Sequence, residues 1–271
     1  MNILFFCPHW GLEQLSLEDA FRKIKDAGYD GVEMAVPFDE QKKEEFLKLL
    51  DTYQLLLIAQ QWSAAGGTFA EYKASFEKHL YHFAEVKPLF INSQTGKDYY
   101  PFEQNKALIE RAEQISKETG IKIVHETHRG KFSFCAAITR KFLENIPSFT
   151  LAADFSHWCN VSESFLQDQK ETVQVAIGRS AHIHSRVGHT QAAQVSDPRA
   201  PEWQEAVEHH LVWWDAIIEH QKKSHNATFT ITPEFGPWPY MPALPFTRQP
   251  ITSQWEVNLY MRDLLKKRYA N

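Results

Sequence analysis

The sequence has few cysteines and no long apolar segment. Only Cys7, Cys135 and Cys159 occur among 271 residues. An odd number of widely spaced cysteines argues against a disulfide framework and favours reduced thiols. No run of about 18 apolar residues is present, which argues against a membrane-spanning helix. The first residues also lack the basic start and apolar run of a signal peptide, so we expect a cytoplasmic protein.

The sequence also lacks an excess of basic residues. The 29 lysines and arginines stand against 34 aspartates and glutamates, which gives a formal net charge of −5. Such a chain has no general electrostatic attraction to nucleic acid or to an anionic membrane, and we expect neither as a partner. With 43% hydrophobic residues, including 19 phenylalanines and 8 tryptophans, the chain has ample material for a globular core.

The first part of the chain shows the pattern of one strand followed by one helix. Residues 3–7 form a short apolar run that predicts a strand. Residues 16–27 have apolar positions at helical spacing, and Ser16 with Asp19 three positions later is typical of a helix start. Gly28 suits the left-handed end of this helix. The segment is therefore predicted to be a strand–helix unit.

The same unit repeats along the rest of the chain. Short apolar runs predict strands at 31–36, 55–60, 89–92, 121–126, 149–154, 181–184 and 227–234. Amphipathic segments predict helices at 40–52, 68–85, 102–118, 134–145, 164–177, 201–223 and 252–268. Continuous rather than alternating apolar strands are expected where both faces of a parallel sheet are covered. Eight strand–helix pairs predict a single (β/α)₈ barrel domain spanning 1–271.

Chemically active side chains gather at the ends of the last four predicted strands. Strand five ends at Glu126, strand six at Asp154, strand seven at the pair His182 and His184, and strand eight at Glu234. Active sites of such barrels lie at this end of the strands. Converging carboxylates repel one another, and a divalent cation removes that repulsion. The donor set favours one Mn²⁺ or Mg²⁺, with Co²⁺ or Zn²⁺ as alternatives.

These residues resemble a known family over nearly the whole chain. The glutamate ending strand five, Asp-x-x-His at 154–157, His-x-His at 182–184 and Glu-Phe-Gly at 234–236 are similar to the xylose isomerase-like barrel superfamily, in particular its sugar phosphate isomerase/epimerase branch. The resemblance implies that Glu126, Asp154, His184 and Glu234 bind the metal. It also implies that His157 contacts the substrate.

The resemblance further implies a metal-dependent isomerase or epimerase of carbohydrate metabolism. Such enzymes move a proton on the carbon beside a carbonyl group, through an enediolate that the metal stabilises. By resemblance, Glu126 and Glu234 are the catalytic acid/base pair in addition to binding the metal. Mn²⁺ is the metal we expect first. The expected partner is a small sugar or sugar derivative, which the sequence does not name.

Other residues near the strand ends are candidates to bind the sugar. Aromatic rings pack on sugars and amides bind hydroxyl groups, although each of these residues can equally serve packing or loop capping. Arg186 is a candidate to bind a substrate carboxylate or phosphate, or to pair with a neighbouring acid. The candidates that follow or lie in the first three strands are His9, Trp10, Glu33, Gln61 and Trp62.

Three alternative functions use the same barrel. A nuclease of the endonuclease IV type carries three zinc ions on additional histidines, but strands three and four end in Gln60-Gln61 and Asn92-Ser93-Gln94 instead. A dehydratase acting on a keto-sugar or polyol would use the same metal. A non-catalytic sugar-binding barrel would keep only the pocket. Metal content, product mass and solvent-deuterium incorporation distinguish these alternatives.

The sequence says little about assembly. Its aromatic content is compatible with a homodimer or homotetramer. In the adjacent pair Trp213 and Trp214, within predicted helix 201–223, we expect one ring to pack against the barrel and the other to mark a subunit contact.

Overall fold

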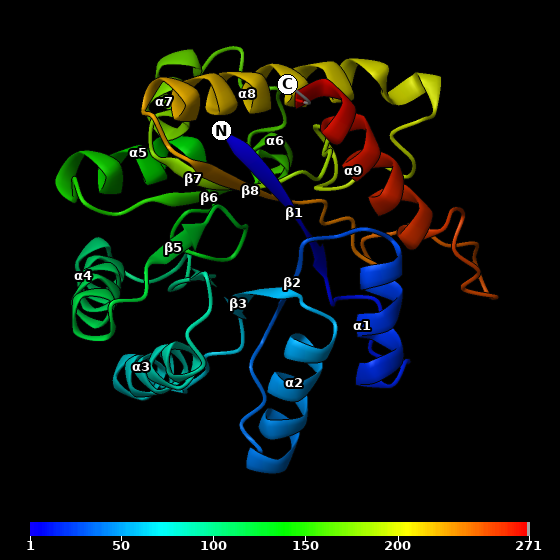
Figure 1. Cartoon of the computed structure of the whole chain (residues 1–271). Coiled ribbons are helices and arrows are strands. Elements are labelled where there is room, and N and C mark those ends of the chain that lie inside the picture. Colours follow the sequence, from blue (N-terminus) through cyan, green and yellow to red (C-terminus); the bar gives the residue numbers. More distant parts are fainter. Residues whose placement is uncertain (270–271) are drawn as a thin grey trace.

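A computed structural model describes residues 1–269. Its eight strands form a closed barrel in sequence order, and β1 and β8 pair in parallel to close it. Figure 1 shows the helices around the outside of the strands, with α9 lying beside α1. Arg262 and Lys266 of α9 donate hydrogen bonds to the backbone carbonyl oxygens of Ala27 and Gly28. These bonds hold the last helix against the C-terminal end of the first helix. The predicted (β/α)₈ barrel is confirmed.

The elements alternate as the sequence predicts. The strands are β1 (Asn2–Pro8), β2 (Gly31–Met34), β3 (Leu56–Gln61), β4 (Phe90–Ser93), β5 (Ile123–Glu126), β6 (Leu151–Ala153), β7 (Ser180–His184) and β8 (Thr228–Thr232). The helices are α1 (Leu17–Asp26), α2 (Glu40–Thr52), α3 (Phe69–Glu85), α4 (Phe102–Thr119), α5 (Ala136–Asn145), α6 (Phe155–Ser162), α7 (Lys170–Ile177), the 3₁₀ turn η1 (Pro201–Trp203), α8 (Gln204–Lys223) and α9 (Gln254–Tyr269). No helix among residues 1–269 is both long and apolar enough to cross a bilayer.

The segment after β6 differs from the prediction. One helix was expected over 164–177, but the chain forms α6 directly after β6 and then the shorter α7. Asp154 is the N-cap of α6, and its side chain accepts a hydrogen bond from the backbone N–H of Ser156. Aspartate is a preferred N-cap because its oxygen satisfies a free N–H of the first turn. Asp154 is therefore an N-cap as well as a strand end, and the strand pattern alone does not predict α6.

Two predicted elements also have different bounds. Strand 227–234 ends early, at Thr232, because Pro233 has no N–H to continue the ladder. Helix 201–223 divides into η1 and α8. The expected subunit contact in α8 is wrong, since Trp213 and Trp214 are both buried, at 8% and 1% exposure.

The interior of the barrel is arranged in two layers. The lower layer is a small apolar cluster that contains Phe6, Ile58, Phe90, Val124 and Ala152. Because side chains alternate along a strand, the residue two positions further on points to the same face. On β3 to β5 those positions carry the polar residues Gln60, Asn92 and Glu126, and directly after β6 the position is Asp154. The apolar layer therefore supports a polar layer at the carboxyl ends of the strands.

Candidate metal centre

The upper layer brings the four predicted metal ligands together. We call Glu126, Asp154, His184 and Glu234 the carboxylate–histidine cluster. Each offers a ligand atom within 4.8 Å of those of the other three. All four side chains are buried, with exposure between 0% and 3%. The sequence thus predicted four residues from four strands that the fold does place at one point.

His184 lies at the centre of the cluster. Its Nδ1 is 2.9 Å from a carboxylate oxygen of Glu234 and 3.7 Å from one of Glu126. This nitrogen is buried and has no aligned hydrogen bond within the described part of the chain. A buried nitrogen without an aligned hydrogen bond is costly, so this position suits a bound ion. Nδ1 therefore faces the position that a cation would occupy between the carboxylates.

Amide and hydroxyl groups hold the carboxylates of the cluster in place. Glu234 Oε1 accepts a hydrogen bond from Gln60 Nε2 at 2.9 Å. Glu126 accepts bonds from Asn92 Nδ2 and Gln94 Nε2, both at 3.2 Å. These neutral donors orient the carboxylates without neutralising them. Excess negative charge therefore remains in the cluster.

The charge balance of this region suits a divalent cation. The cluster and the adjoining Glu33 bring four buried carboxylates together. Arg186 and His184 pair with them as cations. His157 and His182 also lie within 4 Å of Asp154 and Glu33, but burial lowers the pKa of both rings and favours their neutral form. Buried charge without compensation is strongly destabilising. When His184 binds an ion as a neutral imidazole, the four carboxylates face Arg186 alone. A divalent ion offsets most of the remaining negative charge, and three carboxylates with one imidazole are suitable ligands for such an ion.

The environments of the ionisable groups differ. Burial raises the pKa of Glu126 to about 8, with His184 opposing and Glu234 adding to the effect. Burial alone would raise the pKa of Glu234, but the cations His184 and Arg186 hold it below its usual value. Burial alone would lower the pKa of His184, but Glu234, Glu33 and Glu126 raise it well above its usual value. Without an ion, Glu126 and His184 therefore both carry protons at neutral pH.

Metal binding is consequently expected to release protons. An ion on Nδ1 of His184 must displace a proton, and an ion on Glu126 displaces another. At pH 7 we expect about one to two protons released per ion, and an affinity that rises with pH up to at least the pKa of about 8 of Glu126. Calorimetric titration in buffers of different ionisation enthalpy measures the release. Binding that liberates no proton and is insensitive to pH would contradict this assignment.

A cavity of about 480 Å³ opens above the cluster. Glu234 and Arg186 contribute to its lining, together with the indole of Trp10 and the phenol of Tyr240. Trp10 meets Tyr240 edge-on, with ring centroids 5.1 Å apart. A Cβ at Gly236 would lie 2.1 Å from the Trp10 ring, so the glycine makes room for that ring. Pockets of this size with aromatic walls and few polar groups accommodate small organic ligands.

The predicted substrate-binding residues divide into two groups. His9, Trp10, Trp62 and Arg186 line the cavity. Gln61 and His157 are outside the lining of this cavity, and both side chains are fully buried. Gln61 points away from the cavity and its Oε1 accepts the Ser93 hydroxyl at 3.0 Å. Because Ile58 faces the barrel interior, strand alternation directs Gln60, and not Gln61, towards the cavity.

Arg186 connects the cavity with the cluster. Its Nη2 donates to Asp154 and also to Nε2 of His157, which lies 2.8 Å away. Its guanidinium lies 4.9 Å from the ring centroid of Tyr240, while Nη1 is buried and has no hydrogen-bond partner among residues 1–269. The two N–H groups of Nη1 are therefore left for oxygen atoms of a ligand.

Several cavity residues were not proposed as sugar-binding residues from the sequence. Gln60 and Gln94 carry no distinctive motif, and Tyr240 comes from the long loop between β8 and α9. The signal that could have identified Gln60 is its position two residues after an interior apolar residue. Other members of this group are Glu13, Met34, Ala35 and His128.

A second potential ligand group lies beside the cluster. Ligand atoms of Glu126, His128 and His157 also lie within 4.8 Å of one another. However, Arg186 donates to Nε2 of His157, so this nitrogen is already an acceptor, and the guanidinium opposes a second cation nearby. This arrangement favours one ion over several.

The fold and the cluster together define a (β/α)₈ barrel with a buried carboxylate–histidine site suited to a divalent metal. Residues 21–234 match the family described as xylose isomerase-like TIM barrel. The match covers most of the chain, and the chain belongs to this family. No curated protein matches it in sequence.

The barrel is similar to several solved structures. D-allulose 3-epimerase from Methylomonas sp., in complex with D-allulose, has a TM-score of 0.62 and 15% identity, with 99% of this chain and 98% of that chain covered. The 3-keto-D-glucoside 4-epimerase from E. coli has a TM-score of 0.62 and 13% identity, with coverage of 98% and 100%. A xylose isomerase-like barrel from Mycobacterium smegmatis, in complex with magnesium, has a TM-score of 0.64 and 11% identity, with 98% of both chains covered. At such identities the similarity shows the fold alone.

Proposed function

We propose that this chain is a metal-dependent sugar isomerase or epimerase. The observation that carries the proposal is the convergence of three carboxylates and one imidazole at the base of an aromatic-walled cavity. The proposed substrate is a small sugar or sugar derivative. This is the activity that the family resemblance and the donor set support together.

Glu126, Asp154, His184 and Glu234 would hold the ion. Carboxylates with one imidazole favour Mn²⁺, with Mg²⁺, Co²⁺ and Zn²⁺ as the other suitable ions. When bound, such an ion supplies positive charge that stabilises the enediolate formed beside a sugar carbonyl. The same charge neutralises the excess of carboxylates described above.

Glu126 and Glu234 would transfer the proton. Glu234 borders the cavity and so can reach a substrate, while Gln60 orients its other oxygen. Glu126 is oriented by Asn92 and Gln94. Two carboxylates held in different environments are suited to opposite roles, one as the acid and one as the base.

The cavity walls would bind the sugar. Trp10 and Tyr240 offer ring surfaces, and Trp62 lies at the mouth with 56% of its surface exposed. The free Nη1 of Arg186 and the imidazole of His9 would bind substrate oxygens. Burial lowers the pKa of His9, which keeps this ring neutral near pH 7.

A screen of ketoses and aldoses in D₂O with added Mn²⁺ tests the activity. The proposal expects an isomer of unchanged chemical composition, with deuterium on the carbon beside the carbonyl. Loss of water from the substrate would instead identify a dehydratase. Tight sugar binding without deuterium incorporation would identify a non-catalytic binding protein, and either result would overturn the proposal.

A further inference from the structure

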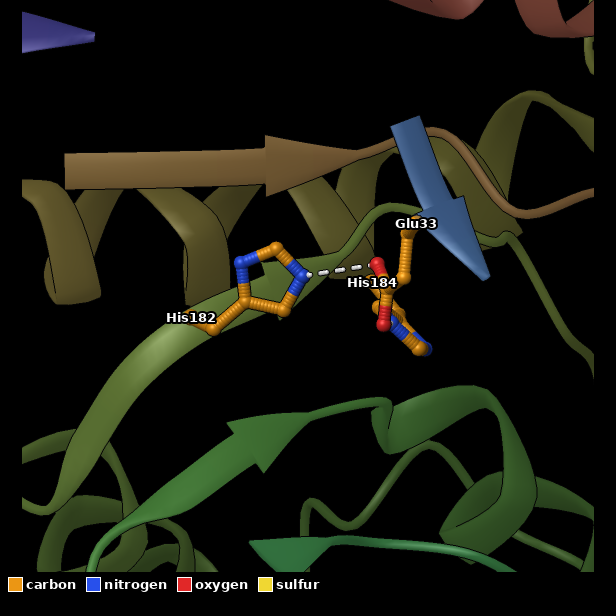
Figure 2. Close-up of side chains that lie close together, drawn as sticks. All are labelled: Glu33, His182 and His184. Atoms are coloured by element: carbon orange, nitrogen blue, oxygen red, sulfur yellow. Dashed lines mark hydrogen bonds and ion pairs between the residues drawn. The ribbon is translucent and has the colours of Figure 1, made fainter. Parts of the chain in front are cut away.

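Glu33 is a buried carboxylate that faces both histidines of β7. It comes from β2, is 1% exposed, and lies across the barrel from His182 and His184. Figure 2 shows its carboxylate directed at the two imidazole rings. Its Oε1 lies 3.0 Å from Nε2 of His184, and its Oε2 lies 3.4 Å from Nε2 of His182.

Both oxygens of Glu33 are already occupied by donors. Oε1 also accepts a bond from Asn92 Nδ2 at 2.8 Å, and Oε2 accepts the Thr232 hydroxyl at 2.5 Å. The Thr232 oxygen in turn lies 3.2 Å from Nε2 of His182, whose Nδ1 lies 2.7 Å from the Thr230 hydroxyl. The carboxylate of Glu33 is therefore directed at donors of the protein, although Glu33 borders the cavity.

This arrangement determines which nitrogen of His184 is available. A carboxylate only accepts hydrogen bonds, so Nε2 of His184 must carry a proton towards Glu33. Asn92 cannot act as the alternative partner of Nε2, because its amide hydrogens serve Glu33 and Glu126. Nδ1 is then the nitrogen that remains, and it faces the carboxylates of Glu234 and Glu126.

We propose that Glu33 is a positioning residue that holds His184 with its proton on Nε2 and its Nδ1 directed at the metal. The inference rests on the proposed metal site and adds a residue to it that does not touch the ion. Histidine ligands of metals commonly donate their second N–H to a carboxylate, which fixes the ring and strengthens its donor nitrogen.

Metal affinity in the absence of substrate tests this role. Free Mn²⁺ is measured by electron paramagnetic resonance during titration of chelator-treated wild type and Glu33→Gln. The glutamine keeps the shape of the side chain but loses its charge, so we expect the dissociation constant to rise about 10- to 100-fold. The control is Thr230→Val, which alters a contact of His182 one layer below and is expected to leave the dissociation constant unchanged.

A second measurement concerns the wild type alone and needs no variant to fold. In Zn²⁺-loaded protein with ¹⁵N-labelled histidines, His184, identified by comparison with His184→Gln, should carry its proton on Nε2. A proton on Nδ1, or equal Mn²⁺ affinity in wild type and Glu33→Gln, would overturn the role of Glu33 and leave the metal site standing. Absence of Mn²⁺ and Zn²⁺ binding by the wild type would overturn the proposed function and this inference together.

Discussion

Glu126→Gln and Glu234→Gln are each expected to abolish turnover of a confirmed substrate. Glutamine has nearly the same shape as glutamate but cannot accept or deliver the transferred proton. Positioned acid/base groups contribute about 10²- to 10⁴-fold to the rate, so kcat should fall by at least that range. Loss of a carboxylate that holds the ion would lower kcat further. Steady-state kinetics with the substrate found by the deuterium screen measures it.

The control separates loss of proton transfer from loss of the fold or of the ion. Glu110→Gln makes the same chemical change on an exposed position of α4 and should retain wild-type kinetics. The metal content of each variant is measured alongside its kcat. A Glu126→Gln or Glu234→Gln protein with near wild-type turnover would refute the catalytic role of that residue.

A divalent ion is expected to stabilise the folded protein strongly. Four buried carboxylates with two cationic partners leave negative charge that an ion neutralises. At an ion concentration about 100 times the dissociation constant, binding to the native state contributes about 2.7 kcal/mol. For a chain of this size, that corresponds to a rise in Tm of roughly 5–10 °C. Thermal unfolding of chelator-treated protein with and without Mn²⁺ measures the shift.

The rise in Tm on addition of Mn²⁺ should require the carboxylate–histidine cluster. His184→Ala removes the only imidazole of the cluster and should lose most of the stabilisation. His220→Gln removes an exposed histidine of α8 and should keep the full shift. A shift of wild-type size in His184→Ala would show that the ion binds elsewhere.

The barrel was predictable because its signals are local. Apolar runs alternate with helical patterns, and helix starts carry N-caps. One of them is Ser16, whose hydroxyl oxygen accepts a hydrogen bond from the backbone N–H of Asp19, as expected. The helix α6 was missed because Asp154 performs two roles, as a member of the cluster and as an N-cap. A pattern that marks Asp154 as a strand end and candidate metal ligand does not reveal that the same residue also begins a helix.

The four cluster residues were predictable because the fold rule is simple: strand ends meet at one rim of the barrel. The partners of these residues were harder to predict. Glu33 and His184 are 151 positions apart, and no local pattern links them. Gln61 was predicted to bind the substrate, whereas Gln60 lines the cavity. The reason is different here, because the sequence alone does not show which residues of β3 face the barrel interior.

The most direct test of the account is the number of ions bound per chain. Chelator-treated protein is titrated with Mn²⁺, followed by Mg²⁺, Co²⁺ and Zn²⁺ in separate experiments, and the bound metal is quantified by elemental analysis. We expect one ion per chain, with binding lost when Asp154→Asn and Glu234→Gln are combined. A wild-type protein with no affinity for any of these ions would contradict it.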